Sequence, residues 1–199
     1  MVTDGIFAVL GYLLGSMSSA VIVCRLAGLP DPRTQGSHNP GATNVLRIGG
    51  KRAAALTLGG DFLKGLIPVV LATLCDAGEV GVAGAGLGAF LGHLYPIFFG
   101  FKGGKGVATS LGVILGLSPW VALAALCTWI VVAVTMRISS LAALIAAALS
   151  PLYLWLFDLP TVYVVSVLLM VILLVWRHRS NIEKLIAGTE SRIGDPKNR

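Results

Sequence analysis

A short segment rich in glycine and lysine carries the strongest chemical signal in the sequence. It reads Gly-Phe-Lys-Gly-Gly-Lys-Gly over residues 100–106 and runs into the expected start of a helix at Val107. Glycines let main-chain amides approach an anion, and lysines and a helix N-terminus add positive potential. It is not a Walker A loop, because Phe99 stands where that motif needs its first glycine. We interpret it as a phosphate-binding loop, since membrane anchoring would explain the lysines but not the glycines. The residues concerned are Lys102, Gly103, Gly104, Lys105, Gly106 and Thr109.

A second polar cluster occupies residues 36–44, and Arg47 follows one helical turn later. A Pro-Gly pair turns the chain, short side chains supply neutral donors, and an arginine has the fork geometry that suits phosphate. The alternative is an ordinary connecting loop made of turn residues, and the cluster alone does not decide between the two. Its candidate residues are Ser37, Asn39, Gly41, Ala42, Thr43 and Asn44.

A third cluster follows the last apolar stretch, over residues 177–190. His178, Asn181 and Leu185 have helical spacing, so the histidine and the asparagine can share one face directed at the bundle. The alternative is a basic helix that only attracts anionic lipid. That alternative accounts for the nearby cations but not for the neighbouring histidine and asparagine.

Two charged residues, Asp61 and Lys64, lie inside an apolar span at spacing i, i+3. A charge at the bilayer centre costs about 2.5–3.5 kcal/mol on insertion scales, so we expect the two to pair with each other or with the polar loops. A structural role is as plausible for this pair as a direct one, and such residues also occur in ion carriers. His93 is expected to make a hydrogen bond within the bundle, and the glycines every fourth residue over 84–92 predict a close helix-packing face.

The composition is that of a membrane protein. Of 199 residues, 56% are hydrophobic and only 12% are charged, about half the usual charged fraction of a soluble domain. The net charge of +6 could suggest nucleic acid, but the short loops contain no basic helix or aromatic platform, so anionic lipids or phosphorylated substrates are the better partners. Three cysteines at unrelated positions predict neither a disulfide framework nor a metal site, and we expect no metal and no cofactor.

Hydropathy predicts an all-α bundle of seven transmembrane helices in a single domain over residues 1–199. The N-terminus lacks a basic leader region, so we expect the first span to belong to the mature protein. Ser118-Pro119 interrupts an apolar stretch that is too long for one crossing, which predicts a tight turn there. The expected spans are Gly5–Leu26, Ala53–Leu74, Val80–Phe99, Val107–Leu117, Trp120–Met136, Leu141–Phe157 and Thr161–Trp176. The fourth of these is short enough to be a half-helix instead.

The positive-inside rule orients the bundle with its N-terminus outside and its C-terminus in the cytoplasm. Of the 15 lysines and arginines, all except Lys64 fall in or beside loops on one predicted face. The opposite face has Asp4, Asp76, Glu79 and Asp158 and no basic residue. All motif segments are therefore expected on the cytoplasmic face, at 33–52, 100–109, 137–140 and 177–199.

Two known patterns of membrane lipid enzymes are missing. No histidine is followed by an aspartate five positions later, so the His-x4-Asp acyltransferase pattern is absent, and so is the multi-aspartate metal motif of CDP-alcohol phosphotransferases. The combination of motifs instead resembles the bacterial acyl-phosphate:glycerol-3-phosphate acyltransferase family over nearly the whole chain. The matching segments are Gly15–Ala20, Gly36–Arg47, Gly60–Gly65, Gly92–Gly106 and His178–Glu190.

This resemblance implies an inner-membrane enzyme with its active site on the cytoplasmic face. It would move a fatty acyl group from a long-chain acyl phosphate to the sn-1 hydroxyl of glycerol 3-phosphate, as the first acylation step of phospholipid biosynthesis, and we expect a monomer in the lipid bilayer. The alternatives are a carrier for an organophosphate or another anion, which polar motifs on one face disfavour, and a regulatory membrane anchor, which would not explain three donor-rich loops.

The resemblance also implies roles for individual residues. It gives catalytic roles to Ser37, Arg47, Lys105, His178 and Asn181, and a structural role to Glu190. The other candidates of the first two clusters would bind substrate. Ala143 stands where the family more often has a serine, which leaves Ser139 and Ser140 as hydroxyl candidates, and we assign Ser140 to substrate binding.

Overall fold

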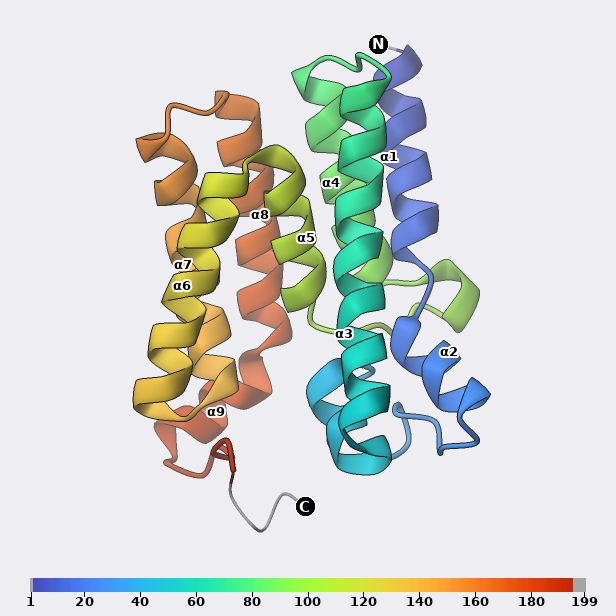
Figure 1. The fold of residues 1–199 in the computed structure, drawn as a ribbon, viewed down its shortest axis with the longest axis vertical. Helices are drawn as coiled ribbons and strands as arrows, with labels where there is room; N and C mark the ends of the chain where they lie inside the picture. Colours follow the sequence, from blue (N-terminus) through green and yellow to red (C-terminus); the bar gives the residue numbers. More distant parts are fainter. Residues whose placement is uncertain (1, 195–199) are drawn as a thin grey trace.

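The computed structural model describes residues 2–194, which form nine α-helices and one short 3-10 helix and contain no strand (Figure 1). The predicted all-α class is therefore confirmed. The helices are α1 (Val2–Gly15), α2 (Ser19–Leu26), α3 (Ala42–Leu74), α4 (Glu79–Leu94), η1 (Ile97–Phe99), α5 (Val107–Leu117), α6 (Pro119–Met136), α7 (Ser139–Leu156), α8 (Thr161–Arg177) and α9 (Arg179–Ile186).

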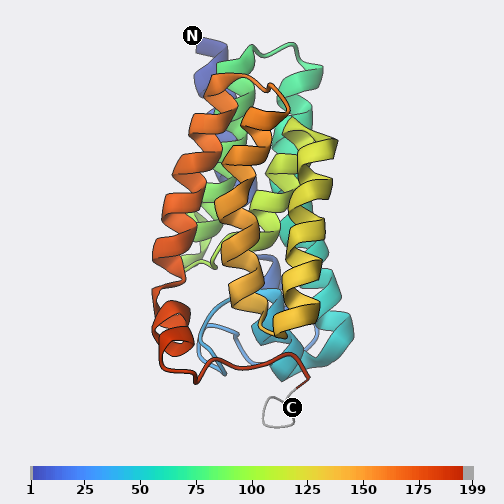
Figure 2. The same ribbon diagram turned by 90° about the vertical axis from the view of Figure 1, so that its left-hand side faces the viewer.

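The long helices run side by side along the longest axis of the molecule (Figures 1 and 2). The short helix α5 contacts α3, α4, α6 and α8, so it lies at the centre of the bundle. The core around it contains fully buried side chains, including Phe90, Leu94, Leu154, Met170 and Leu174. The start of α5 is thereby held firmly, and the glycine-rich segment 100–106 leads directly into it.

Helix α1 packs against α4 through small residues, as the glycine spacing predicted. A Cβ atom on Gly88 or Gly92 of α4 would overlap main-chain atoms of α1, and one on Gly11 or Gly15 of α1 would overlap main-chain atoms of α4. Without a side chain the two backbones approach closely, which is how helices associate when lipid surrounds them.

The predicted turn at Ser118-Pro119 is confirmed. Helix α5 ends at Leu117, and the hydroxyl of Ser118 accepts a hydrogen bond from the Val121 amide at 3.5 Å at the start of α6. Pro119 is the first residue of α6, where its missing amide hydrogen costs nothing.

The first predicted span, Gly5–Leu26, is not one continuous helix, since α1 ends at Gly15 and α2 begins at Ser19. The break exposes main-chain oxygens that an unbroken helix would satisfy. The Lys64 ammonium of α3 donates to one of them, the Met17 oxygen, at 2.9 Å. The predicted ion pair is also confirmed, with Lys64 Nζ 2.8 Å from Asp61 Oδ1, and both side chains are buried. The break therefore receives a buried cation from a neighbouring helix, and this contact cannot be inferred from the first span alone.

Two other helix limits differ from the prediction. Helix α3 begins at Ala42, well before Ala53, and bends at Gly50, whose φ of 75° lies in the left-handed region. Helix α4 ends at Leu94 rather than at Phe99, because Pro96 disfavours helical geometry at Tyr95. Thr43 and Asn44, which were predicted to lie in the first loop, thus belong to the first turn of α3. The chain also leaves α4 five residues earlier than predicted, at Leu94 instead of Phe99.

The bundle has the dimensions of an integral membrane protein. By length and composition five helical segments of the described chain could span a bilayer, or six if the bent pair α8 and α9 forms one span. Helix α1 begins at one end of the long axis and α9 lies at the other, which agrees with an odd number of crossings (Figure 1). The count of seven and the orientation stay predictions. The end of the predicted tail segment, 195–199, lies outside the described residues.

Candidate active site

The glycine-rich segment, α9 and the start of α7 are joined by one hydrogen-bond network. Lys105 Nζ donates to Asn181 Oδ1, and Asn181 Nδ2 donates to Glu190 Oε1 at 2.8 Å. The hydroxyl of Ser140 donates to the same carboxylate oxygen, also at 2.8 Å. Residues from three separate motif segments thus meet at the end of the bundle where α9 lies.

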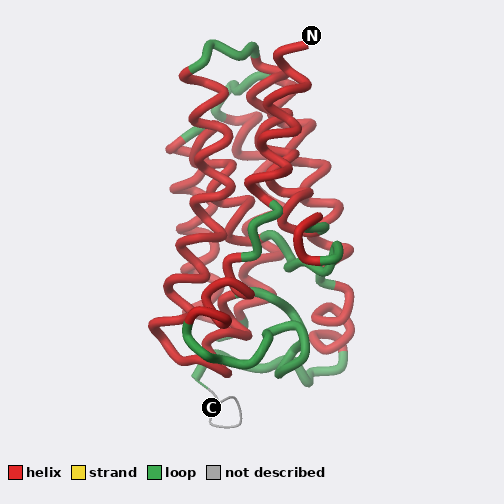
Figure 3. The backbone as a smooth tube through the Cα atoms, turned by 90° about the vertical axis from the view of Figure 1, so that its right-hand side faces the viewer, coloured by secondary structure: helices red, strands yellow, loops and turns green. Residues whose placement is uncertain are grey.

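The segment after α9 crosses this end of the bundle (Figure 2). Arg47 Nη2 donates to the Ser191 hydroxyl at 2.9 Å, which brings the first turns of α3 to the tail. Arg137, between α6 and α7, donates to the Ile193 oxygen at 3.0 Å. Figure 3 shows the long loop before α3 at the same end. The tail therefore lies across a group of polar side chains that we call the mouth, namely Arg47, Lys105, Arg137, Ser140, Asn181 and Glu190.

The mouth has an excess of positive charge. Lys105 is half-buried, and burial is the main cause that lowers the pKa of its ammonium to about 8. The Glu190 carboxylate opposes this shift, while nearby cations add to it. These cations are Lys184, Arg177 and Arg47. A lysine whose pKa is lowered in part by neighbouring cations is suited to binding an anion, which would relieve the repulsion.

Three of the four glycines in the segment 100–106 are required by its packing on the end of α4. The Gly104 amide donates to the His93 oxygen at 3.2 Å, and a Cβ on Gly103 or Gly104 would overlap atoms of His93. Gly106 has a φ of 89°, and a Cβ there would overlap the Phe90 ring. The sequence suggested glycines that make room for an anion, whereas these contacts show that they first let the loop lie against the helix.

The first cluster is organised by Asn44, which is buried in the first turn of α3. Its Oδ1 accepts the Ser37 amide at 2.9 Å, and its Nδ2 donates to the main-chain oxygens of Pro32 at 2.8 Å and Gln35 at 3.0 Å. Asn44 thus holds the preceding loop against the helix and has no donor left for a substrate. Of the candidate site residues in this cluster, Ser37, Thr43 and Arg47 are exposed.

Comparison with known proteins identifies the family. The family model described as glycerol-3-phosphate acyltransferase matches residues 5–188. The chain belongs to this family. The glycerol-3-phosphate acyltransferase of Thioalkalivibrio sulfidiphilus is 59% identical over 184 residues, covering 92% of this chain and 91% of the relative. That of Methylococcus capsulatus is 60% identical over 183 residues, covering 92% of each.

Two solved structures share the fold of this acyltransferase. The crystal structure of PlsY, an integral membrane glycerol 3-phosphate acyltransferase, in its glycerol 3-phosphate form has a TM-score of 0.92 and 40% identity, covering 96% of both chains. Its lysophosphatidic acid form has a TM-score of 0.89 and 38% identity, covering 96% of this chain and 95% of that one. At this identity the likeness covers sequence as well as fold.

The remaining predicted site residues of the acyltransferase differ in accessibility. Lys102 is exposed on the loop, and Gly41 and Ala42 form the N-terminal end of α3 after the half-buried Asn39. Thr109 is fully buried and its hydroxyl donates to the Asp61 oxygen at 2.9 Å. This contact gives Thr109 a role in joining α5 to α3 rather than in reaching a substrate at the mouth.

His178 lies at the junction of α8 and α9, which differ in direction by 60°. Its Nδ1 is 2.8 Å from the Leu174 oxygen, and because a carbonyl can only accept, Nδ1 carries the hydrogen. The side chain is buried beside Lys105, so it does not share an open face with Asn181. Its Nε2 is the nitrogen left for other contacts.

Two arginines of the acyltransferase were missed as site residues in the sequence. Arg177 donates from Nε to the Gly104 oxygen at 3.1 Å and from Nη2 to the Gly103 oxygen at 2.7 Å. Arg33 donates to the Phe99 oxygen at 3.0 Å and pairs with Asp31, and its hydrogen bonds lower the pKa of that carboxyl. In the sequence both look like cations that only orient the protein in the membrane.

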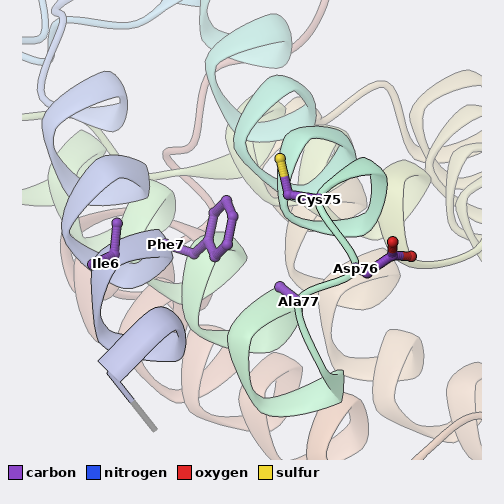
Figure 4. A pocket seen from close by; sticks show the side chains of 5 residues that line it. All are labelled: Ile6, Phe7, Cys75, Asp76 and Ala77. Carbon is purple, nitrogen blue, oxygen red and sulfur yellow. The ribbon is translucent and has the colours of Figure 1, made fainter.

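In the part of the chain that the structure describes, the other end of the acyltransferase has no comparable cluster. A hollow of about 320 Å³ there is lined by Ile6, Phe7, Cys75, Asp76 and Ala77 (Figure 4). Its lining has one carboxylate and no cation. Within residues 2–194, no group of three His, Cys, Asp or Glu side chains is placed to hold a metal ion.

Proposed function

We propose that this acyltransferase moves a fatty acyl group from an acyl phosphate to the sn-1 hydroxyl of glycerol 3-phosphate. The bond between the acyl carbon and the phosphate oxygen breaks, the new ester forms at the glycerol oxygen, and inorganic phosphate leaves. The observation that supports this proposal is the meeting of Arg47, Lys105 and the glycine-rich loop at one mouth. Two reactants that each carry a phosphate need such a concentration of positive charge.

An acyl phosphate is a mixed anhydride with a good leaving group, so the protein mainly has to align the reactants and neutralise their charge. We assign the phosphates to Arg47, Lys105 and Lys102, and to the free amides at the start of α3 beside Ser37. Asn181 and Ser140 meet at Glu190 and hold Lys105 in place. We place the site on the cytoplasmic face of the bacterial inner membrane, where both water-soluble and lipid reactants can reach it.

The proton of the glycerol hydroxyl passes to an oxygen of a substrate phosphate. His178 is the alternative base, and its Nε2 keeps the lone pair because Nδ1 donates to the Leu174 oxygen. Burial of the ring, however, lowers the pKa of His178 to about 4, which makes it a weak base for a hydroxyl proton. No aspartate follows any histidine at the spacing that membrane acyltransferases use for a base. These observations favour substrate-assisted catalysis.

The donor is tested by incubating the purified protein with labelled glycerol 3-phosphate and either palmitoyl phosphate or palmitoyl-CoA. We expect labelled 1-acyl-glycerol 3-phosphate from the acyl phosphate only. Product from the CoA donor alone would contradict the proposed donor. If neither donor gives product and vesicles containing the protein take up glycerol 3-phosphate, the protein is a carrier instead.

The rate is expected to depend on the charge of Lys105. Because the pKa of this lysine is lowered to about 8, it is charged below pH 8 and loses its proton above it. The value of kcat/KM should therefore fall as the pH rises through about 8. A bound phosphate stabilises the ammonium, so the corresponding fall in kcat should occur at higher pH. Both are measured as pH profiles of initial rate.

The same pH profiles test which group accepts the proton of the glycerol hydroxyl. A phosphate monoester takes up its second proton at about pH 6, so the acid limb should lie near that pH. The variant His178→Ala should keep this limb if the phosphate is the base. Complete loss of the limb in that variant, with glycerol 3-phosphate binding intact, would assign the proton to His178.

A further inference from the structure

The peptide units of the glycine-rich loop are held from two sides. On one side Arg177 donates to the main-chain oxygens of Gly103 and Gly104. On the other side the Gly104 amide donates to the His93 oxygen. The C=O and N–H of a trans peptide point in opposite directions. Both oxygens therefore face Arg177, and the amides of the same peptide units face away from it.

One of these amides is free to bind a ligand. The amide opposite the Gly103 oxygen is that of Gly104, which is already bonded to His93. The amide opposite the Gly104 oxygen is that of Lys105, and it donates to no atom of the described residues. Arg177 thus fixes the direction in which the Lys105 amide points, on the residue whose ammonium contacts Asn181.

We propose that Arg177 is a positioning residue, which holds the two glycine carbonyls so that the Lys105 amide and ammonium together receive a substrate phosphate. This inference rests on the proposed function and adds a role that acts through the loop rather than through contact with substrate. It explains why an arginine ends α8. Only a guanidinium offers two donors in a fixed fork that can bridge successive carbonyls.

The packing on the side of the loop opposite Arg177 supports this role. His93, which receives the Gly104 amide, is buried, and its Nδ1 lies 3.6 Å from Asp61 Oδ1 of the buried ion pair on α3. The loop is therefore held between α8 and the α3–α4 pair. Arg177 holds the two carbonyls from one side, and the end of α4 supports the loop from the other. The free Lys105 amide therefore keeps one direction, as a preorganised anion site requires.

The charge of Arg177 has a second, separable effect. It is one of the cations that lower the pKa of Lys105, together with Lys184 and Arg47, while Glu190 acts in the opposite direction. His178 and Asn181 also lie beside Lys105. A variant that loses the charge should raise the alkaline limit of the rate, whereas a variant that keeps the charge but loses the fork should not.

The test compares Arg177→Lys and Arg177→Gln with the matched control Arg179→Gln. Arg179 is exposed, lies over the Trp176 ring at 4.9 Å, and donates no hydrogen bond to the glycine-rich loop among the described residues. We expect both Arg177 variants to raise the KM for glycerol 3-phosphate at least tenfold. Only Arg177→Gln should move the alkaline limb to higher pH, because a lysine keeps the positive charge. The control should match the unmodified protein in both measurements.

Two results would overturn the inference. One is an Arg177→Lys variant with unchanged KM, since a single ammonium cannot hold the carbonyls as a fork does. The other is an Arg177→Gln variant whose yield falls while KM and pH profile stay the same. If the unmodified protein shows no activity with palmitoyl phosphate, the proposed function fails. The positioning role of Arg177 is then tested by measuring how much glycerol 3-phosphate raises the thermal stability of the protein. Arg177→Lys should weaken this stabilisation, and Arg179→Gln should not.

Discussion

The variant Arg47→Gln is expected to lower kcat/KM for glycerol 3-phosphate by about 100-fold or more. Removal of one preorganised donor to developing charge costs about 10²–10³ in rate in other enzymes, and here a full positive charge is lost as well. Arg47 is exposed at the mouth, and among the described residues its guanidinium is held only by the Ser191 hydroxyl, which a phosphate can displace. Initial rates over a range of glycerol 3-phosphate concentrations measure the effect.

Two control variants separate substrate binding from general charge effects. Arg52→Gln removes the same charge from the same helix at another exposed position and should leave the rate within about twofold. Ser191→Ala removes the partner of Arg47 and should also have a small effect. Equal losses in Arg47→Gln and Arg52→Gln would mean that Arg47 acts only through the overall charge of this face.

The variant Gly103→Ala is expected to lower kcat/KM by about 100-fold through a change in the loop alone. Its Cβ would overlap the main-chain oxygens of His93 and Leu94 at the end of α4, and main-chain atoms there cannot move aside as a flexible side chain can. The loop must therefore shift, and a displacement of about 1 Å in a catalytic group can cost about 10²-fold in rate. The Arg177 contact to the Gly103 oxygen should be lost with it.

A glycine elsewhere in the bundle provides the matched control. A Cβ added to Gly59 in α3 would meet open space, so Gly59→Ala should keep full activity. Thermal unfolding in detergent should show a loss of about 1–3 kcal/mol for Gly103→Ala at most, which leaves a folded protein to assay. A Gly103→Ala variant with the normal rate would show that the loop position does not determine catalysis.

The sequence predicts most of the bundle because its signals are local. Apolar length, the proline after Ser118 and the four-residue glycine spacing in α4 each describe one segment and its immediate surroundings. The Asp61–Lys64 pair is likewise a contact within one helix. These predictions hold because insertion into lipid requires each span to satisfy its own main-chain groups.

Two of the helix limits that were predicted wrongly lie where a distant segment satisfies polar groups that the local sequence leaves without partners. A break between α1 and α2 leaves carbonyls free, and it is stable because Lys64 of α3 donates to Met17. Asn44 looks like a loop residue in the sequence, yet it lies in the first turn of α3. Its side-chain amide donates instead to main-chain oxygens of the loop before that helix. Such compensation depends on contacts between distant segments and has no signature in either segment.

The sequence by itself determined the chemical character of this protein: a membrane bundle with its cations and donor-rich motifs at one end. The tertiary structure alone decided which of these groups act together. It brings Arg47 to the tail, Asn181 to Lys105, and Arg177 to the carbonyls of the glycine-rich loop. The physical reason is that residue types and local periodicity specify what a side chain can do and where its helix runs. The partners of a polar group are set by the packing of helices that lie far apart in the chain.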